Sequence, residues 1–276
     1  RIDFQLGWDI DREAVVQPEY YLPKVQAMLG EGVEFEPEWV SVYTFQCMSM
    51  DQYRYGPVFF AGDSAHQVSP FGARGCNGGM QDVDNLAWKL AAVYHGEADS
   101  RLLETYHEER KKGAEENILN SSRTTDFMTP KTPIAKLFRE SVLDLVEHTD
   151  AMRPLVNSGR LSLPCVYDGS SLNGPDDDRM PVRTRVGATL VDAPINGGWL
   201  IDQLGGEFKI LAVNCDIQIE GLQVVSLDAD PTLCERYLGS VAQAVYLIRP
   251  DQIIAARWEK ADATDVIAAL QVAKGG

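Results

Sequence analysis

The 276-residue sequence predicts a mixed α/β protein that is built in two parts. Short apolar, strand-like runs are interspersed with longer segments whose apolar residues recur every three or four positions, the period of an amphipathic helix. Hydrophobic residues make up 45% and charged residues 24% of the chain, a composition that allows a buried core. From Leu161 a stretch rich in Pro, Gly, Ser and Asp interrupts these patterns, and a second series of strands and helices follows it.

The first part, predicted to span residues 1–160, begins with strands and ends with helices. The expected strands are RIDFQL (1–6), VSVYTFQCM (40–48) and GPVFFAGD (56–63), of which the last has the continuous apolar character of a strand buried in a parallel sheet. The expected helices are PEYYLPKVQAML (18–29), which Gly30 ends, a segment from about Asn77 to Gly96, and two charged segments at 102–122 and 133–152. The second of these helices carries an apolar stripe made of Met80, Val83, Leu86, Ala87, Leu90 and Ala91.

A linker at 161–180 is predicted to join the first part to a second part at 181–276. The second part shows strand-like runs, a helix, a hairpin that turns at Pro250–Asp251, and a closing helix that Asp262 or Thr264 caps. In chain order these are strands at 187–193, 207–215 and 222–228, a helix at 231–240, the hairpin at 244–258 and the last helix at 262–274. Strands mixed with helices that end in a hairpin and a helix suit a small α/β sandwich of the thioredoxin-like type.

A formal net charge of −16 limits the partners of this chain. Nucleic acids and anionic membrane surfaces are bound by clustered Lys and Arg, which an acidic chain does not favour. No apolar segment approaches the ~20 residues that span a bilayer, and the start does not resemble a signal peptide. We therefore expect a cytoplasmic protein with no nucleic-acid or membrane partner. The five scattered cysteines and four histidines have no paired ligand spacing, which predicts reduced thiols and no metal site.

The strongest candidate site lies in the stretch GPVFFAGDSAHQVSPFGARGCNGGMQDVDNLAWKLA at 56–91. Asp63 follows an apolar run, where α/β sheets present ligand contacts, and its carboxylate can accept hydrogen bonds from hydroxyl groups. Four glycines between 72 and 79 remove side chains at a helix start, where unpaired N–H groups and the helix dipole attract an electron-rich group. The stretch predicts a site for a polyhydroxylated cofactor with one electron-rich end. The alternative is an ordinary strand–turn–helix crossover whose glycines only permit tight packing.

The same stretch resembles the second FAD-binding motif of the single-component aromatic hydroxylases, the flavoprotein monooxygenases related to para-hydroxybenzoate, phenol and 3-(3-hydroxyphenyl)propionate hydroxylases. The flanks share the resemblance. RIDFQLGWDID and VSVYTFQCM resemble the last strands of the substrate domain, LLETYHEERKKGAEENI resembles the helix after the motif, and YLIRPDQIIAARW resembles a hairpin of the thioredoxin-like C-terminal domain. The resemblance implies a truncated FAD- and substrate-binding portion of an aromatic hydroxylase, followed by a thioredoxin-like domain.

The resemblance also implies the cofactor contacts. They fall on Gly62, Asp63, Pro70, Gly75, Cys76 and Asn77. The Asp63 carboxylate would bind the ribityl chain of FAD, Gly62 would allow its approach, and Pro70 would lie beside the reactive edge of the isoalloxazine. The last three residues would point backbone N–H groups at the pyrimidine end of the ring, where the helix dipole stabilises negative charge on reduced flavin. No catalytic side chain is assigned, because the chemistry belongs to the flavin.

The implied reaction is the hydroxylation of a small phenolic or aromatic substrate through a flavin hydroperoxide, with NAD(P)H as the reductant. The sequence contains no GxGxxG, and Asp168–Gly169 is interpreted as a turn in the linker. We therefore expect the chain to be a fragment that binds FAD weakly or not at all and is inactive alone. Two alternatives stay open: a non-catalytic packing or dimerisation module, and a flavoprotein of the same fold that performs epoxidation, Baeyer–Villiger or tailoring oxidation. A homodimer is compatible with each of them.

Other residues of the first part have weaker interpretations. His66 is expected to form a local hydrogen bond rather than act as a general base, and the Cys76 side chain to be a small group rather than a reactive thiol. Tyr43 and Phe45 are candidates for lining an aromatic substrate pocket, although such strand residues more often serve the core. Trp88 is expected to have a packing role, and Lys89 is expected to make a surface or sheet-edge contact. Because the second part has no CxxC pair, we expect it to dock or dimerise rather than exchange thiols.

Overall fold

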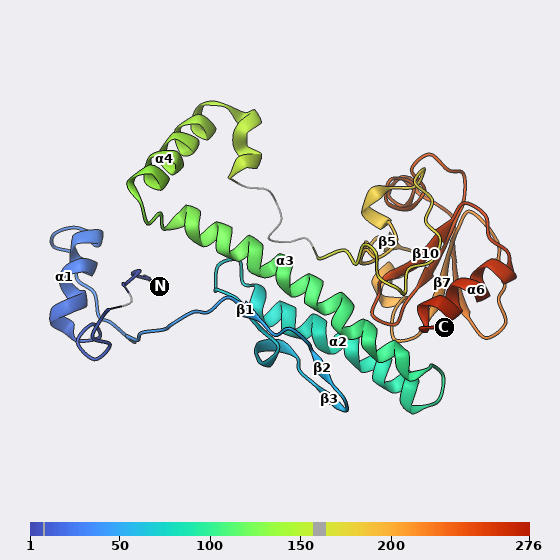
Figure 1. Cartoon of the computed structure of the whole chain (residues 1–276). Coiled ribbons are helices and arrows are strands. Elements are labelled where there is room, and N and C mark those ends of the chain that lie inside the picture. The colour runs from blue at the N-terminus through green and yellow to red at the C-terminus, as the bar shows by residue number, and fades with distance from the viewer. Residues whose placement is uncertain (8, 157–163) are drawn as a thin grey trace.

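The computed structural model describes residues 1–7, 9–156 and 164–276. An antiparallel pair of long helices, α2 (Arg74–Tyr94) and α3 (Glu104–Met128), runs through the middle of the molecule (Figure 1). Helix α1 stands apart near the N-terminus, whereas the C-terminal residues form a sheet domain toward the other end of the helix pair (Figure 1). The predicted mixed α/β class is confirmed.

The remaining helices of the first part agree with the sequence patterns. They are α1 (Pro18–Leu29), the 3-10 turn η2 (Ser100–Leu103), α4 (Pro133–His148) and the 3-10 segment η3 (Asp150–Leu155). Gly30 ends α1 with a φ of 99°, as predicted, because that backbone conformation favours glycine. The Thr132 side chain caps α4 by accepting a hydrogen bond from the amide of Ala135. Neither α1 nor α4 contributes a buried residue, so the core of this part depends on α2 and α3.

The three strands predicted in the first part do not form as expected. The short strands observed there are β1 (Met48–Ser49), β2 (Arg54–Tyr55), β3 (Val58–Phe59) and β4 (His66–Gln67). β1 pairs with β4 and β2 with β3, both antiparallel, so the apolar run at 56–63 folds back at Gly56 instead of entering a parallel sheet. In the described part of the chain, the segments 1–7 and 40–47 have no strand beside them. A strand needs a neighbouring edge for its N–H and C=O groups, and local alternation does not supply one.

Helix α2 buries a polar face rather than the expected apolar stripe. It begins at Arg74, three residues before the predicted start. Met80, Val83 and Leu90 are 68%, 57% and 39% exposed. The buried residues of the helix are instead Arg74, Gly78, Asp82, Asn85, Lys89 and Ala92. Because buried polar groups are tolerated only when they are hydrogen-bonded, the neighbours of α2 have to supply their partners.

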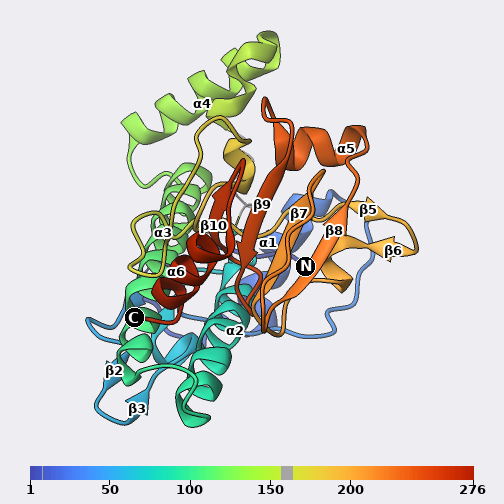
Figure 2. The same ribbon diagram turned by 90° about the vertical axis from the view of Figure 1, so that its right-hand side faces the viewer.

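The C-terminal residues form a four-stranded sheet in the order β10–β9–β7–β8 (Figure 2). The strands are β7 (Lys209–Val213), β8 (Gln223–Leu227), β9 (Ala244–Ile248) and β10 (Ile254–Trp258). β7 and β8 are parallel, and the other two pairings are antiparallel. Leu211 and Val213 lie in one apolar cluster and Ile210 in another, because alternate residues of β7 point to opposite faces. Helix α6 (Ala263–Ala273) contributes to the second cluster, so both faces of the sheet are buried.

Most elements predicted for the second part are confirmed. The hairpin turns at Pro250–Asp251, and Asp262, rather than Thr264, caps α6 by accepting two amide hydrogen bonds. The strand predicted at 187–193 is wrong, since only Thr189 forms an isolated bridge there. The shorter elements are η5 (Val182–Thr184), β5 (Pro194–Ile195), β6 (Gly198–Trp199), η6 (Leu200–Asp202), α5 (Pro231–Leu233) and the π-helical turn η7 (Cys234–Leu238).

Residues 164–180 connect the helix pair to the sheet and contact both. Leu172 packs with Leu102 at the start of the α3 region, and the amide of Gly174 donates to the carbonyl of Ala255 in β10 at 2.8 Å. The domain limits at 160 and 180 stay a prediction, and part of the predicted linker, 157–163, lies outside the described residues. Within the described ranges, no helix combines the length and the apolar character that crossing a bilayer requires.

Candidate functional site

Two backbone turns meet within the stretch 56–91. Gly62 begins the 3-10 turn η1 (Gly62–Ser64) with a φ of 58°, a conformation that favours glycine. A Cβ atom added to Gly79 would lie 3.4 Å from the Cα atom of Gly62, so this turn lies against the first turns of α2. The structure thereby brings Gly62 and Asp63 next to the helix start that contains Gly75–Asn77.

The start of α2 has no side-chain cap. Ala73 precedes the helix in the left-handed conformation, with φ 52° and ψ 41°, and its amide donates to the carbonyl of Pro70 at 3.1 Å. The Asn77 side chain donates to the carbonyl of Ala73 at 2.8 Å, so it braces the turn. In the described part of the chain, no acceptor outside the helix contacts the amides of Gly75 and Cys76. These donors, together with the positive end of the helix dipole, are free to bind an electron-rich group.

The carboxylate of Asp63 faces solvent beside this helix start. Its side chain is exposed and accepts no hydrogen bond from any described residue; only its backbone carbonyl is used, by Gln67 at 3.4 Å. Pro70, Cys76 and Asn77 are also exposed. The six predicted contacts thus surround an open surface rather than a filled interior.

One buried carboxylate ties the two turns together. Asp82 is fully buried on α2 and accepts hydrogen bonds from the amide of Gly62 at 2.8 Å and from Nε of Arg110 at 2.7 Å. Its Oδ2 atom also lies 2.7 Å from Nε2 of His66. Arg110 in turn donates to the hydroxyl of Tyr167 and to the carbonyl of Gly78. We call these residues the Asp82 cluster: Gly62, His66, Asp82, Arg110 and Tyr167.

The charges in the Asp82 cluster stabilise the ionised carboxylate. Burial alone raises the pKa of Asp82, but the hydrogen bond from His66 and the positive charge of Arg110 outweigh it and lower that pKa. Burial raises the pKa of the Tyr167 hydroxyl to about 12, so this hydroxyl stays protonated at neutral pH. The local hydrogen bond expected of His66 is confirmed.

A second buried cluster lies further along α2, at the contact with the C-terminal hairpin. Both carboxylate oxygens of Glu109 accept hydrogen bonds from Arg249, at 2.6 and 2.9 Å, and Nζ of Lys89 donates to one of them at 2.8 Å. Arg249 also binds Asp251, and Asn85 donates to the carboxylates of both Glu109 and Asp251. We call these residues the Glu109 cluster: Asn85, Lys89, Glu109, Arg249 and Asp251.

The Glu109 cluster corrects the interpretation of Lys89. This side chain is fully buried rather than at the surface, because Glu109 and Asn85 both accept hydrogen bonds from its ammonium group. Burial lowers the pKa of Lys89 to about 8, with Arg249 adding to the shift and Glu109 opposing it. Burial alone would raise the pKa of Glu109, but Arg249 and Lys89 hold it well below its usual value.

The residues that organise the site were missed by sequence reasoning. Asp82, Arg110 and Glu109 received no role, although Gly78, Asp82, Asn85 and Lys89 recur at alternating spacings of four and three. Such spacing places side chains on one face of a helix. The sequence therefore contained a polar stripe that indicated the buried face, but the prediction followed the apolar stripe on the opposite face.

Other candidate residues lie away from the two turns. The rings of Tyr43 and Phe45 stack with centroids 6.0 Å apart and are 55% and 49% exposed, on a segment that forms no strand. The structure does not bring them to the start of α2 as part of a described pocket. Trp88 packs edge to face with Phe208, 5.5 Å away, so its expected packing role is confirmed.

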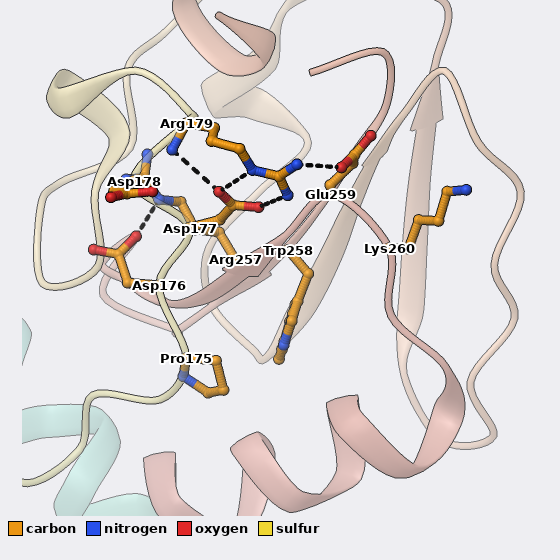
Figure 3. A pocket seen from close by; sticks show the side chains of 9 residues that line it. All are labelled: Pro175, Asp176, Asp177, Asp178, Arg179, Arg257, Trp258, Glu259 and Lys260. Atoms are coloured by element: carbon orange, nitrogen blue, oxygen red, sulfur yellow. Dashed lines mark hydrogen bonds and ion pairs between the residues drawn. The ribbon is translucent and has the colours of Figure 1, made fainter. Parts of the chain in front are cut away.

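A surface hollow in the C-terminal domain contains none of the predicted contacts (Figure 3). Most of its charged side chains pair with one another: Arg179 binds Asp177 and Glu259, and Arg257 binds Asp176 (Figure 3). The arginines of this hollow are therefore already engaged by carboxylates of the same chain.

The helix start lies within the part of the chain that matches a known family. Residues 11–121, which contain the whole stretch 56–91, match the family described as FAD binding domain. The chain is 32% identical over 239 residues to an uncharacterized aromatic compound monooxygenase of Bacillus subtilis, covering 81% of this chain and 45% of that protein. It is 31% identical over 269 residues to 6-methylpretetramide 4-monooxygenase of Streptomyces rimosus, covering 86% of this chain and 48% of that protein.

A solved structure shares the fold. The crystal structure of the flavin-dependent monooxygenase PieE in complex with FAD and substrate superposes with a TM-score of 0.71 at 23% identity, covering 96% of this chain and 55% of that one. The chain spans about half the length of the curated relatives that it matches. Together, the family match and these relatives identify the chain as a relative of the FAD-dependent, aromatic hydroxylase-like flavoproteins.

Proposed function

We propose that this chain supplies the flavin-ring end of the FAD site in a monooxygenase that uses NAD(P)H and hydroxylates a phenolic or other aromatic substrate. One observation carries the proposal: the uncapped, glycine-lined start of α2 lies against the turn that presents Asp63. The named activities of the relatives support the reaction class, since both are monooxygenases and one acts on aromatic compounds.

The described residues fit the ring and the ribityl chain of FAD. The amides of Gly75 and Cys76 would donate to the electron-rich edge of the ring, and the Asp63 carboxylate would accept hydrogen bonds from ribityl hydroxyls. Pro70 would contact the edge of the ring. When bound, FAD would supply the activation of molecular oxygen that amino-acid side chains do not provide. The role of the chain would be to orient the ring and to place the positive end of the α2 dipole against its electron-rich edge.

We also propose that these 276 residues by themselves hold FAD weakly and are inactive. The sequence contains no GxGxxG, the motif that cradles a pyrophosphate at the start of a helix. The pyrophosphate of FAD would therefore gain no such cradle from this chain. The residues at the start of α2 would contribute only part of the binding free energy.

Titration with FAD, followed by flavin fluorescence, tests the proposed site. Asp63→Ala is expected to weaken FAD binding about tenfold, because it removes an acceptor for ribityl hydroxyls. Asp51→Ala is the matched control, since Asp51 is also exposed but does not belong to the two turns. Equal affinities of the two variants, or a protein that takes up no FAD, would contradict the proposal. Tight FAD binding and oxidation of NAD(P)H by these 276 residues alone would contradict the proposed inactivity.

The Glu109 cluster favours a packing role for the C-terminal domain as a second candidate function. We propose that this domain is a thioredoxin-like module used for docking on α2 and α3, a proposal that its strand order and its closing helix support. Its cysteines, Cys215 and Cys234, are too far apart in sequence to form a CxxC pair. Coincident urea unfolding of the two parts, followed by tryptophan fluorescence and far-UV circular dichroism, is expected. Two separate transitions would contradict a docking role.

A further inference from the structure

We infer that Asp82 is a positioning residue that holds the turn of Gly62 and Asp63 against the start of α2 and thereby sets the geometry of the FAD site. The inference rests on the proposed function, because Asp63 and the amides of Gly75 and Cys76 are its proposed cofactor contacts. Asp82 itself is fully buried and would not touch the cofactor.

The contacts of Asp82 join the two halves of the site directly. Its carboxylate lies two turns into α2, which carries the free amides. The Oδ2 atom accepts the amide hydrogen bond of Gly62 at 2.8 Å, one residue before Asp63. The same oxygen binds His66 at 2.7 Å, just after the turn. The Oδ2 atom of Asp82 therefore binds the residue before Asp63 and a residue shortly after it, so it holds the short segment that presents Asp63 from both sides.

The rest of the cluster fixes the direction of this carboxylate. Arg110 binds the other oxygen, Oδ1, at 2.7 Å and is itself 1% exposed. Its outer nitrogens donate to the hydroxyl of Tyr167 at 2.7 Å and to the carbonyl of Gly78 at 3.2 Å. Space for the guanidinium is provided by Gly113, where an added Cβ would lie 2.9 Å from Nη1 of Arg110. A carboxylate held in this way cannot rotate to release the Gly62 amide without breaking a buried ion pair.

If Asp82 served only to stabilise the packing of α2 on α3, it would not need to accept the hydrogen bond from the amide of Gly62. The carboxylate of Glu109 is also buried and neutralised, and it accepts a hydrogen bond from Ser170 in the 164–180 segment, but none of its described partners belongs to the turn that presents Asp63. Asp82 differs because one of its oxygens binds the turn itself, whereas the pairing of β4 with β1 and the hydrogen bond from the amide of Met50 to the carbonyl of Ala65 hold only the residues after the turn. In the described residues, the Asp63 side chain makes no hydrogen bond that would hold this loop in place.

The test measures the turn and the cofactor separately. Asp82→Asn keeps the size of the side chain but places an amide donor against donors, either Gly62 and His66 or Arg110. Amide hydrogen exchange of a peptide covering 61–67 reports on the turn in the ligand-free chain. The FAD dissociation constant and the visible circular dichroism of bound FAD report on the site. Asp84→Asn is the matched control, since Asp84 is exposed on the same helix.

A third variant separates positioning from a general loss of stability. Val266→Ala removes buried methyl groups from the C-terminal core, far in sequence from the turn, because Val266 is fully buried on α6. For Asp82→Asn, we expect exchange in 61–67 to accelerate at least about tenfold and FAD to bind at least about tenfold more weakly. Asp84→Asn and Val266→Ala are expected to leave both quantities, and the circular dichroism of bound FAD, within about twofold of the unmodified chain.

Each other outcome has a defined meaning. Unchanged exchange in 61–67, or an equal weakening of FAD binding by Val266→Ala, overturns the positioning role. If the unmodified protein binds no FAD, the proposed function fails, whereas the exchange measurement still decides whether Asp82 holds the turn. If Asp82→Asn does not fold, His66→Phe replaces it, because it removes one bond to Asp82 while keeping a ring against Tyr53. Unchanged exchange in His66→Phe then overturns the inference.

Discussion

Helices α2 and α6 differ both in the face that they bury and in the way their first turns are satisfied. α6 buries Val266, Ala269 and Ala273 against apolar side chains, and Asp262 caps its start. α2 buries a row of polar groups, exposes much of its apolar side, and begins at a left-handed Ala73 without a side-chain cap. α6 follows the rules for a helix that only has to be stable. α2 departs from them where its start is available to a ligand and where its charges hold other segments, which is the pattern expected of a functional element.

The largest expected effect comes from breaking the buried charges along α2. Glu109→Ala should lower the free energy of unfolding by about 3–5 kcal/mol, because it leaves Arg249 and Lys89 as buried cations without their main partner. The adjacent Glu108→Ala is the control: Glu108 binds Ser171 at the exposed surface, and its loss should cost less than about 1 kcal/mol. Urea unfolding measures both. Similar costs for the two variants would mean that the polar face of α2 contributes no more than an exposed contact.

Acid should lower the free energy of unfolding by protonating the buried carboxylates of Asp82 and Glu109. Because the pKa values of Glu109 and Asp82 are lowered by folding, their contribution is fully present above the unfolded values, near 4, and is lost as the pH falls through the folded values. The free energy of unfolding should therefore decrease below about pH 4. Glu109→Gln should show a lower stability at neutral pH and a shallower decrease in acid. Parallel curves for the variant and the unmodified chain would exclude Glu109 as a source of the acid sensitivity.

A side chain at Gly62 tests whether the open start of α2 depends on its neighbouring turn. Gly62→Val places a branched residue at a φ of 58°, and Gly96→Val does the same at 73° with no atom near the new Cβ. Both should cost about 2 kcal/mol of stability. Only Gly62→Val should also weaken FAD binding, because the strained backbone belongs to the turn that presents Asp63. Equal FAD affinities for the two variants would show that the turn at Gly62 does not contribute to FAD binding.

Removing the cap of α6 should have a smaller and purely structural effect. Asp262→Ala frees the amides of Thr264 and Asp265 and should cost about 1 kcal/mol in urea unfolding. FAD affinity should not change. Asp216→Ala, at an exposed residue of the same domain, controls for the change in net charge. A loss of FAD binding in Asp262→Ala would show that the two helix starts are not independent.

The smallest expected effect is a gain. Ala73→Gly removes the steric penalty of a left-handed alanine and should raise the free energy of unfolding by about 0.5 kcal/mol, after the entropy cost of glycine. Ala87→Gly, at an exposed position inside α2, should instead lower it by about 1 kcal/mol. Thermal unfolding of the two variants shows whether each substitution raises or lowers the stability. A loss in Ala73→Gly would indicate that neighbouring contacts, rather than glycine-like freedom, hold this residue.

Sequence patterns predicted the elements whose partners are local. Gly30, Asp262 and the Pro250–Asp251 turn act within a few residues, so their local signals are sufficient. The segment 40–48 alternates like a strand, but only its last residue has a strand beside it, because pairing depends on residues distant in sequence. The cofactor contacts were placed by resemblance, and the structure brings Gly62 and Asp63 to the helix start.

The buried charges could not be predicted from α2 alone. Asp82 and Lys89 look like surface residues when read with their neighbours, since charged side chains are rarely buried without a partner. Their partners are Arg110 and Glu109, adjacent residues on α3 that point one to each cluster. Only the antiparallel packing of α2 against α3 shows that Asp82 lies opposite Arg110 and Lys89 opposite Glu109.

The distance along the chain between Glu109 and Arg249 has a consequence for biosynthesis. Arg249 follows Glu109 by 140 positions, so at about 5–20 residues per second it leaves the ribosome roughly 7 to 28 s later. During this interval the carboxylate of Glu109 can pair with Lys89 of α2 but not yet with Arg249. The second half of this buried charge cluster therefore forms only after the C-terminal hairpin has been synthesised. A ribosome-bound chain that stops before Arg249 should be cut faster by protease in α2 and α3 than a chain long enough to bring Arg249 out of the ribosomal exit tunnel.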